Sequence, residues 1–199
     1  FMVTSDDAGA LFRAFGQGAD ASGGRLRYSG TLDLDAPGDP IDGRIEIRDF
    51  TLRRAPALAR IATLSSLSGI AGALQGNGIP FDRLDANIGY RGATITIADA
   101  AVRGPSLGLL AAGTIDRPSG TGEIRGTLVP SYYGLNAAPG KIPVLGAVLA
   151  GKGGEGVHTI DFTISGSFGS PRVTVSPASS VAPGALRDIV RRLGGGNRP

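Results

Sequence analysis

Cysteine and tryptophan are absent from this 199-residue sequence, and histidine occurs only once, at His158. Without cysteine the chain cannot form a disulfide framework, a thiolate zinc site or a dithiol redox centre. A single histidine also excludes any metal site that needs several imidazole ligands. The sequence has no uninterrupted apolar run of about 20 residues, so we expect none of its helices to span a bilayer. These absences exclude several classes of metalloprotein and redox enzyme.

Positive charge is in slight excess, but it is dispersed along the chain. The formal net charge is +3, and the adjacent basic pairs are Arg53-Arg54 and Arg191-Arg192. Nucleic-acid-binding proteins concentrate basic residues on one face and add stacking aromatic residues, which make up only 6% of this chain. We therefore expect no nucleic-acid partner.

Alternation of apolar and polar residues is the main structural signal. The 33 glycines and the 41% hydrophobic share favour strands joined by tight turns. In "RLRYSGTLDLD" the apolar residues that share one face are Leu26, Tyr28, Leu32 and Leu34. In "GRIEIRDFTLRR", Phe50 shares the face of Ile47 only if a one-residue bulge lies near Asp49. Further strands are expected within residues 83 to 92, 93 to 104, 107 to 116, 122 to 129, 157 to 168 and 172 to 176.

Four segments have helical character. They are 5 to 15, the almost uncharged 56 to 76, a helical hairpin at 131 to 151, and an amphipathic helix at 183 to 193. We predict one domain over 1 to 199, in the α+β class and mainly β. Its centre is a curled antiparallel sheet or β-groove of about eight to nine strands. The meander occupies 24 to 129 and a β-hairpin 155 to 176, and the apolar and C-terminal helices cap the sheet.

The stretch "GAVLAGKGGEG", 146 to 156, matches the glycine-lysine core of a P-loop and the glycine spacing of a dinucleotide-binding turn. Both motifs require a strand before the glycines and a helix after them, so that a helix N-terminus faces the phosphate. Here an apolar helix is predicted before the loop and a strand after it. The residue that should hold Mg²⁺ is Gly153. We therefore expect that this loop does not bind a nucleotide.

Two further motifs are incomplete. "GPSLG" matches a nucleophile elbow around Ser106, with Asp116 and His158 following, but strands are predicted on both sides, where the elbow needs a helix. "DLDAPGDPIDG" contains Asp33, Asp35, Asp39 and Asp42, but Pro37 and Arg44 occupy positions where a calcium loop needs ligands. Asp82 and Asp85 are interpreted as solvated carboxylates at strand edges, without a partner for acid–base work. We expect no catalytic residue, metal or cofactor.

The C-terminal region carries a more specific pattern. Its segments are Gly-Lys-Ile-Pro with following apolar residues, a Gly/Glu-rich loop, a strand ending in Ser-Gly, a Pro-x-Val-x-Val strand and a Pro-Gly-x-Leu-Arg helix. In the same order, these five segments occupy residues 140 to 145, 151 to 156, 163 to 166, 171 to 175 and 183 to 187. This region resembles the C-terminal part of bacterial AsmA-like proteins, most closely the YhdP-like branch. The sequence "SPAS" at 176 to 179 departs from the Asn-Pro-Leu-Ser type usual there.

The resemblance implies the C-terminal part of a longer periplasmic protein, tethered to the inner membrane through an upstream segment. Such proteins are thought to let phospholipids move along an apolar β-groove towards the outer membrane without covalent chemistry. We therefore expect a non-enzymatic lipid-conduit segment whose partners are acyl chains. The residues expected to line the groove are Leu26, Tyr28, Leu32, Ile45, Ile47, Ile88, Tyr90, Ile95, Ile97, Ile160, Phe162 and Ile164.

The helix over 56 to 76 is expected to cover or gate the groove through Leu58, Ile61, Leu64, Leu67 and Ile70. The terminal helix is expected to contact a membrane or an outer-membrane or envelope protein partner through Arg187, Arg191 and Arg192. The alternative is an interaction or structural module of the envelope with a closed β-core. Periodicity alone does not distinguish an open sheet from a closed one.

Overall fold

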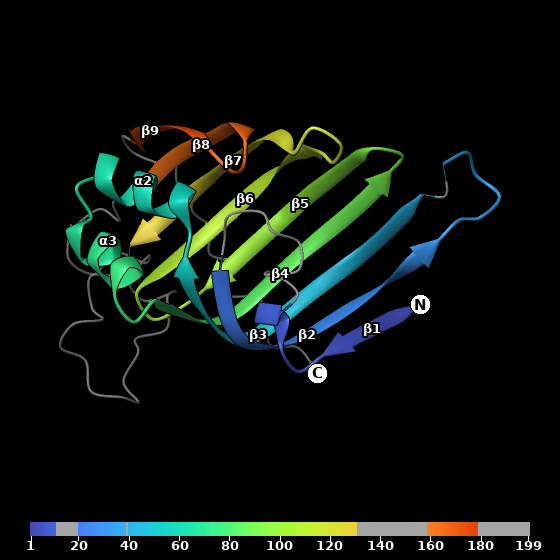
Figure 1. Ribbon diagram of the computed structural model, residues 1–199, viewed down its shortest axis with the longest axis horizontal. Coiled ribbons are helices and arrows are strands. Elements are labelled where there is room, and N and C mark those ends of the chain that lie inside the picture. The colour runs from blue at the N-terminus through green and yellow to red at the C-terminus, as the bar shows by residue number, and fades with distance from the viewer. Residues whose placement is uncertain (11–19, 39, 131–158, 179–199) are drawn as a thin grey trace, which may run out of the picture.

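The computed structural model describes residues 1–10, 20–38, 40–130 and 159–178. Nine antiparallel strands form one sheet, and their order in space follows their order in the chain (Figure 1). The first and last strands each pair with one neighbour, so the sheet is not closed. The strands are β1 (Met2–Ser5), β2 (Asp20–Leu32), β3 (Ile41–Arg54), β4 (Ile79–Arg91), β5 (Thr94–Arg103), β6 (Leu107–Asp116), β7 (Thr121–Pro130), β8 (Thr159–Ser167) and β9 (Arg172–Ala178). The predicted mainly β, antiparallel fold is confirmed.

The strand register separates an apolar face from a polar one. Leu26 pairs with Ile47, which pairs with Leu84, so apolar side chains stand in a row across neighbouring strands. The row continues through Val102, Leu109, Leu128 and Ile160. We call this the inward face, because it carries the buried core; the outward face carries the charged residues between them.

Two strand irregularities keep the apolar residues on the inward face. Asp49 has a φ of 56°, and Ile47 and Phe50 on either side of it are both buried in the core. The irregularity near Asp49 is therefore a left-handed residue and not the one-residue bulge that was expected. It leaves the pairing of β3 with β2 and β4 in register, whereas a second one at Asp99 shifts the pairing of β5 with β6.

Glycines on the inward face allow the sheet to curl tightly. A Cβ built on Gly113 would lie 2.1 Å from the Glu123 carbonyl oxygen, and one on Gly122 would lie 2.2 Å from the Thr114 carbonyl oxygen. No other residue would fit such close backbone approaches on the concave side. These close approaches explain why glycine interrupts the apolar alternation of β6 and β7.

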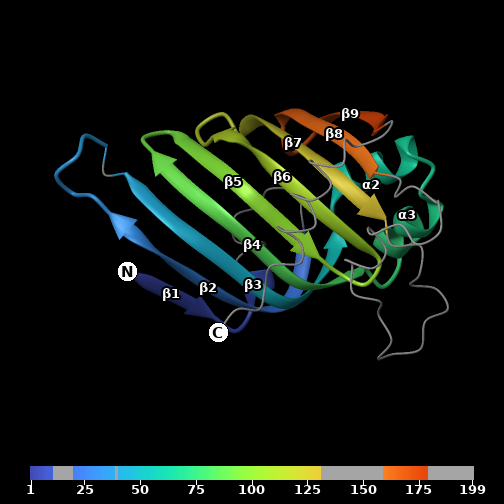
Figure 2. The same ribbon diagram turned by 180° about the vertical axis from the view of Figure 1, so that it is seen from behind.

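Two short helices lie on the inward side at one end of the sheet (Figures 1 and 2). Helix α2 (Pro56–Leu64) contacts β9, and α3 (Ser68–Gln75) contacts β3 and β4. The Arg60 guanidinium also donates a 2.6 Å hydrogen bond to the Pro171 carbonyl, just before β9. β3 and β9 are far apart in the order of the sheet. Because the sheet is curved, the packed pair α2 and α3 contacts both of them.

The single helix predicted over 56 to 76 is divided in two. Ser66 adopts a φ of 58°, and the Leu67 amide bonds to the Ala62 carbonyl at 2.7 Å, which closes the end of α2. The Ser-Ser-Leu-Ser sequence provides this turn, since serine competes for backbone hydrogen bonds and is a weak helix former. None of the helices within the described ranges is long and apolar enough to cross a membrane.

The N-terminal region contains more strand than the sequence indicated. β1 ends at Ser5, where the predicted 5 to 15 helix was expected to begin, and β2 starts at Asp20, before the meander predicted from residue 24. Only residues 8 to 10 of the predicted helix are described as helical. Leu34, expected on the face of β2, lies beyond the strand and is exposed. The segments 131 to 151 and 183 to 193 lie outside the described residues.

Candidate functional site

The inward face is the candidate site, and all twelve predicted groove residues occupy inward positions on it. The residues nearest the helices are buried, and those towards the hairpin between β2 and β3 are more exposed. The buried members are Leu26, Ile47, Ile160 and Phe162. The half-buried members are Tyr28, Ile45, Ile88, Tyr90, Ile95, Ile97 and Ile164.

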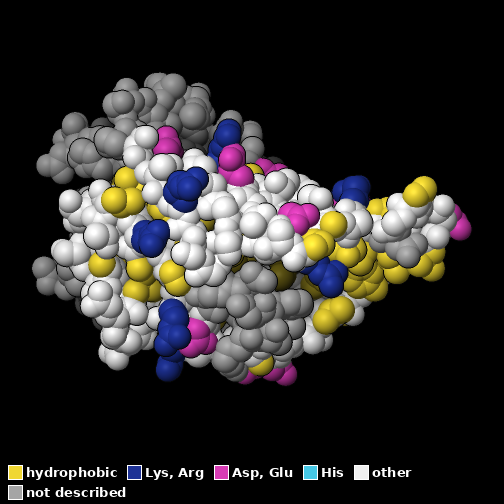
Figure 3. All heavy atoms as spheres, turned by 45° about the horizontal axis from the view of Figure 1, so that its top comes forward, with side chains coloured by type: hydrophobic (Ala, Val, Ile, Leu, Met, Phe, Trp, Pro, Cys, Tyr) yellow, Lys and Arg dark blue, Asp and Glu magenta, His cyan; other side chains and the backbone are white. Residues whose placement is uncertain are grey.

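The outermost apolar layer lies at the hairpin end of the strands. Leu32 pairs with Ile41, Ile41 with Tyr90, Tyr90 with Ile95, and Ile95 with Ile115. Leu32 retains 44% of its accessible surface and the other four are half-buried. Figure 3 shows a hydrophobic area with basic side chains at its border beside the protruding hairpin. The inward face is therefore buried at the helix end and only partly buried at the hairpin end.

Most of the predicted helix residues pack at the buried end of the inward face. Leu58, Ile61 and Ile70 are buried in one cluster with strand residues, and Leu67 packs against that cluster. Leu64 is different: it remains 55% exposed at the last position of α2 and takes no part in the cluster. The prediction that Leu64 faces the groove is wrong: Leu64 is the last residue of α2, and its side chain is exposed to solvent.

The outward face carries an ionic cluster that the sequence did not predict. Asp85 is only 7% exposed, and Arg83 and Arg44 each donate a hydrogen bond to its carboxylate at 2.9 Å. Burial by itself would raise the pKa of Asp85, but these hydrogen bonds and the two positive charges outweigh it and hold the pKa below its ordinary value. The interpretation of Asp85 as a solvated carboxylate without a partner is wrong, whereas Asp82 is exposed.

The cluster has a structural reason in the strand register. Glu46 of β3 lies directly opposite Asp85 of β4, and two carboxylates in that position repel each other. Arg83 removes the conflict, since its guanidinium contacts Asp85 and also the Glu46 carboxylate at 3.2 Å. Arg48 bonds to Glu46 from the same strand. Every carboxylate here has an arginine partner, so we assign the cluster to stability.

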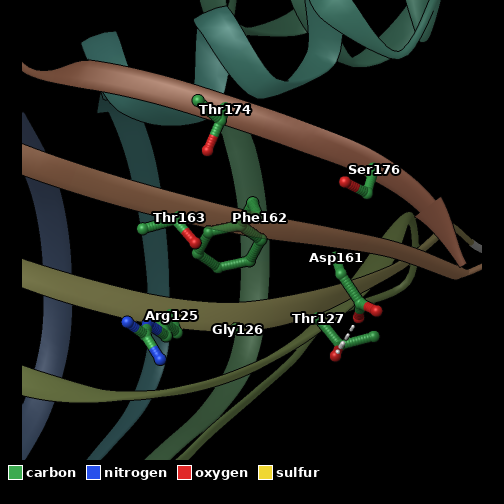
Figure 4. Close-up of a pocket in the computed structure, with 8 residues that line it drawn as sticks. All are labelled: Arg125, Gly126, Thr127, Asp161, Phe162, Thr163, Thr174 and Ser176. Carbon is green, nitrogen blue, oxygen red and sulfur yellow. Dashed lines mark hydrogen bonds between the residues drawn. The ribbon is translucent and has the colours of Figure 1, made fainter.

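A polar depression of about 390 Å³ lies on the outward side of β7, β8 and β9 (Figure 4). Thr127 donates a 2.7 Å hydrogen bond to Asp161 across the strands, and Arg125 forms an ion pair with Glu123. The Phe162 ring belongs to the other face, where it covers Gly126. Asp161 lies directly opposite Thr127 in the register of β7 and β8, so we assign this hydrogen bond to cross-strand pairing.

The remaining motif residues have turn functions. Asp116 accepts hydrogen bonds from the Ser119 hydroxyl and amide, at 2.5 and 3.0 Å, which lower its pKa, and so closes the turn between β6 and β7. Asp33 accepts the amides of Asp35 and Ala36 in the β2–β3 hairpin. Within the part of the chain that is described, no group of three or more potential metal-ligating residues comes together. His158, Asp39 and the 146 to 156 loop lie outside that part.

No protein-family model, curated protein or solved structure matches this chain. The candidate site is therefore defined by its own geometry.

Proposed function

We propose that this chain is a non-enzymatic segment of a lipid conduit, in which phospholipid acyl chains lie on the open part of the inward face. The observation that carries the proposal is the incompletely buried apolar layer formed by five adjacent strands at the hairpin end. A contiguous apolar layer that is left partly accessible to solvent is typical of an interaction site for an apolar ligand. The sequence resemblance to AsmA-like proteins supports the same function.

Acyl chains need no polar recognition to bind such a surface. Each buried methylene contributes about 0.8 kcal/mol, so one 16-carbon chain gains on the order of 10 kcal/mol before the cost of ordering it. The inward positions of β4 to β8 carry only apolar side chains and glycines, so an acyl chain meets no buried charge along them. In this proposal α2 and α3 cover one end of the groove, and lipid enters the other.

The proposed setting is the periplasm, where an upstream segment tethers the protein to the inner membrane and phospholipids pass towards the outer membrane. The alternative, an envelope interaction module, requires a closed β-core. A nine-stranded sheet with two unjoined edges and an incompletely buried inward layer favours the conduit. The proposed partner contacts of Arg187, Arg191 and Arg192 lie outside the described residues.

Site-specific photocrosslinking tests the proposal directly. A benzophenone amino acid at Ile95, on the open inward layer, should crosslink to phospholipid in cells, and mass spectrometry should identify the adduct. The matched control is Thr96, the next residue of the same strand, which is exposed on the outward face. Equal lipid labelling at both positions, or none at Ile95, would contradict the proposal.

A transport assay provides a second test. Phe162 is unsuitable for it, because that side chain is 5% exposed and a charge there would unfold the protein. Ile97→Glu places the charge on a half-buried inward position, and Thr96→Glu places the same charge on the outward face. We expect only the first to block lipid transport by the full-length protein, with both variants folded by circular dichroism.

A further inference from the structure

A cationic side chain lies at the open end of the groove, on its inward side. The Arg117 guanidinium carbon lies 5.7 Å from the centroid of the Tyr90 ring, and Nη1 donates a hydrogen bond to the Tyr90 hydroxyl at 2.9 Å. The Arg117 amide donates to the Ala93 carbonyl at 2.9 Å, which fixes the backbone as well. Because Tyr90 belongs to the outermost apolar layer, the positive charge is positioned directly beside that layer.

Arg117 has a different environment from Arg91, the other arginine beside Tyr90. Arg91 points outward and forms an ion pair with Asp42 at 2.6 Å. Among the residues that the structure describes, no carboxylate lies within ion-pair distance of Arg117, and Tyr90 is its hydrogen-bond partner. A guanidinium has five N–H donors in a planar fork that matches phosphate oxygens. Tyr90 occupies one donor and holds the group in place, which leaves the fork to a ligand.

We propose that Arg117, held by Tyr90, binds the phosphate of a phospholipid whose acyl chains lie on the open inward layers. This inference rests on the proposed conduit function, because it places the headgroup of the same lipid. The phosphate cannot follow the acyl chains inward, because burying a charge without a partner is strongly unfavourable. The inward positions of β4 to β8 carry no charged side chain that could pair with it. Arg117 would therefore fix both the orientation and the depth of the lipid.

Two lipids with identical acyl chains separate headgroup binding from chain binding. Dioleoylphosphatidylglycerol carries the phosphate, and dioleoylglycerol lacks it. We expect Arg117→Ala to weaken binding of the first about tenfold in native mass spectrometry titrations and to leave the second unchanged. Arg117→Lys should restore part of the affinity, because it keeps the charge without the planar fork. The matched control is Arg91→Ala, which should leave both affinities unchanged.

The outcomes distinguish the two proposals. If the wild-type protein binds neither lipid, the conduit function and the phosphate site both fail. If it binds both lipids and Arg117→Ala changes neither affinity, the phosphate site is overturned and the groove remains. If glycerophosphoglycerol, which has no acyl chains, binds as tightly as the phospholipid, Arg117 serves a soluble phosphate compound and the inference is also overturned.

Discussion

The two ends of the inward face are built from the same residue types but have different surroundings. At the helix end, Leu107 and Leu128 are fully buried in a cluster that includes residues of α2 and α3. At the hairpin end, the layer from Leu32 to Ile115 is half-buried except for the exposed Leu32, although it alternates with polar residues just as regularly. Alternation therefore determines which face of the sheet is apolar, and a packed helix determines which part of that face is core.

The largest test of this comparison removes a contact at the helix end. Ile61→Ala truncates a side chain of α2 that is 1% exposed, and we expect it to lower the free energy of unfolding by about 3 to 4 kcal/mol, from lost burial and the cavity left behind. Leu64→Ala, in the same helix, should change it by less than about 0.5 kcal/mol, because Leu64 is exposed. Urea denaturation of both variants measures the difference. Equal losses would show that α2 does not pack in the way described.

A second test concerns the outward face of the sheet. Asp85 lies on β4 between Leu84 and Ala86, which both belong to the inward face. Asp85→Asn should lower the free energy of unfolding by about 2 kcal/mol at neutral pH, because Arg83 and Arg44 lose their charged acceptor. Asn keeps the size of the side chain, so the variant isolates the charge.

The pH dependence of this variant follows from the direction of the Asp85 pKa shift. A carboxylate whose pKa is lowered by folding stabilises the protein above its unfolded value of about 3.9, and this contribution disappears as the pH falls through the lower folded value. The difference between wild type and Asp85→Asn should therefore be constant from pH 5 to 7 and shrink below about pH 4. A difference that persists unchanged into acid would show that the carboxylate charge is not its source.

Much of the fold could be predicted from alternation alone. The segment 107 to 116 coincides with β6, and the alternating segments from 83 to 129 correspond to β4 through β7. β1 and the start of β2 could not be predicted, since four residues and a glycine-rich segment carry no clear period, and pairing with neighbouring strands stabilises them. The break between α2 and α3 was visible as a serine-rich stretch, but its position depends on the turn at Ser66.

The membership of the candidate site was predictable, but its exposure was not. The inward residues follow from a period of two within each strand. The exposure gradient depends on where α2 and α3 dock, which no local pattern encodes. The contact of Arg117 with Tyr90 joins residues 27 positions apart, and the Arg44–Asp85 pair joins residues 41 apart. Both depend on strand register, so they became visible only once the strands were paired.

A third test addresses the open end. Ile95→Ala removes a half-buried side chain from the outermost layer, and we expect it to lower the free energy of unfolding by only about 1 kcal/mol in lipid-free urea denaturation. The neighbouring Thr96→Ala, on the outward face, should be close to neutral. A loss of about 3 kcal/mol or more at Ile95 would mean that this end is as well packed as the helix end, and the two-ended description would fail.

The smallest effect is expected at the rim of the open end. Leu32 is 44% exposed at the last position of β2, and Leu34, two residues further on, is 72% exposed. Leu32→Ser should lower the free energy of unfolding by less than about 1 kcal/mol, and Leu34→Ser by less than about 0.5 kcal/mol, because both side chains are already largely exposed.

If phospholipid occupies the groove, adding it should stabilise the wild-type protein more than Leu32→Ser, and should stabilise Leu34→Ser as much as wild type. This holds because only Leu32 extends the inward layer. Thermal denaturation with and without lipid measures both differences, and an equal response in all three proteins would place the acyl chain away from this rim.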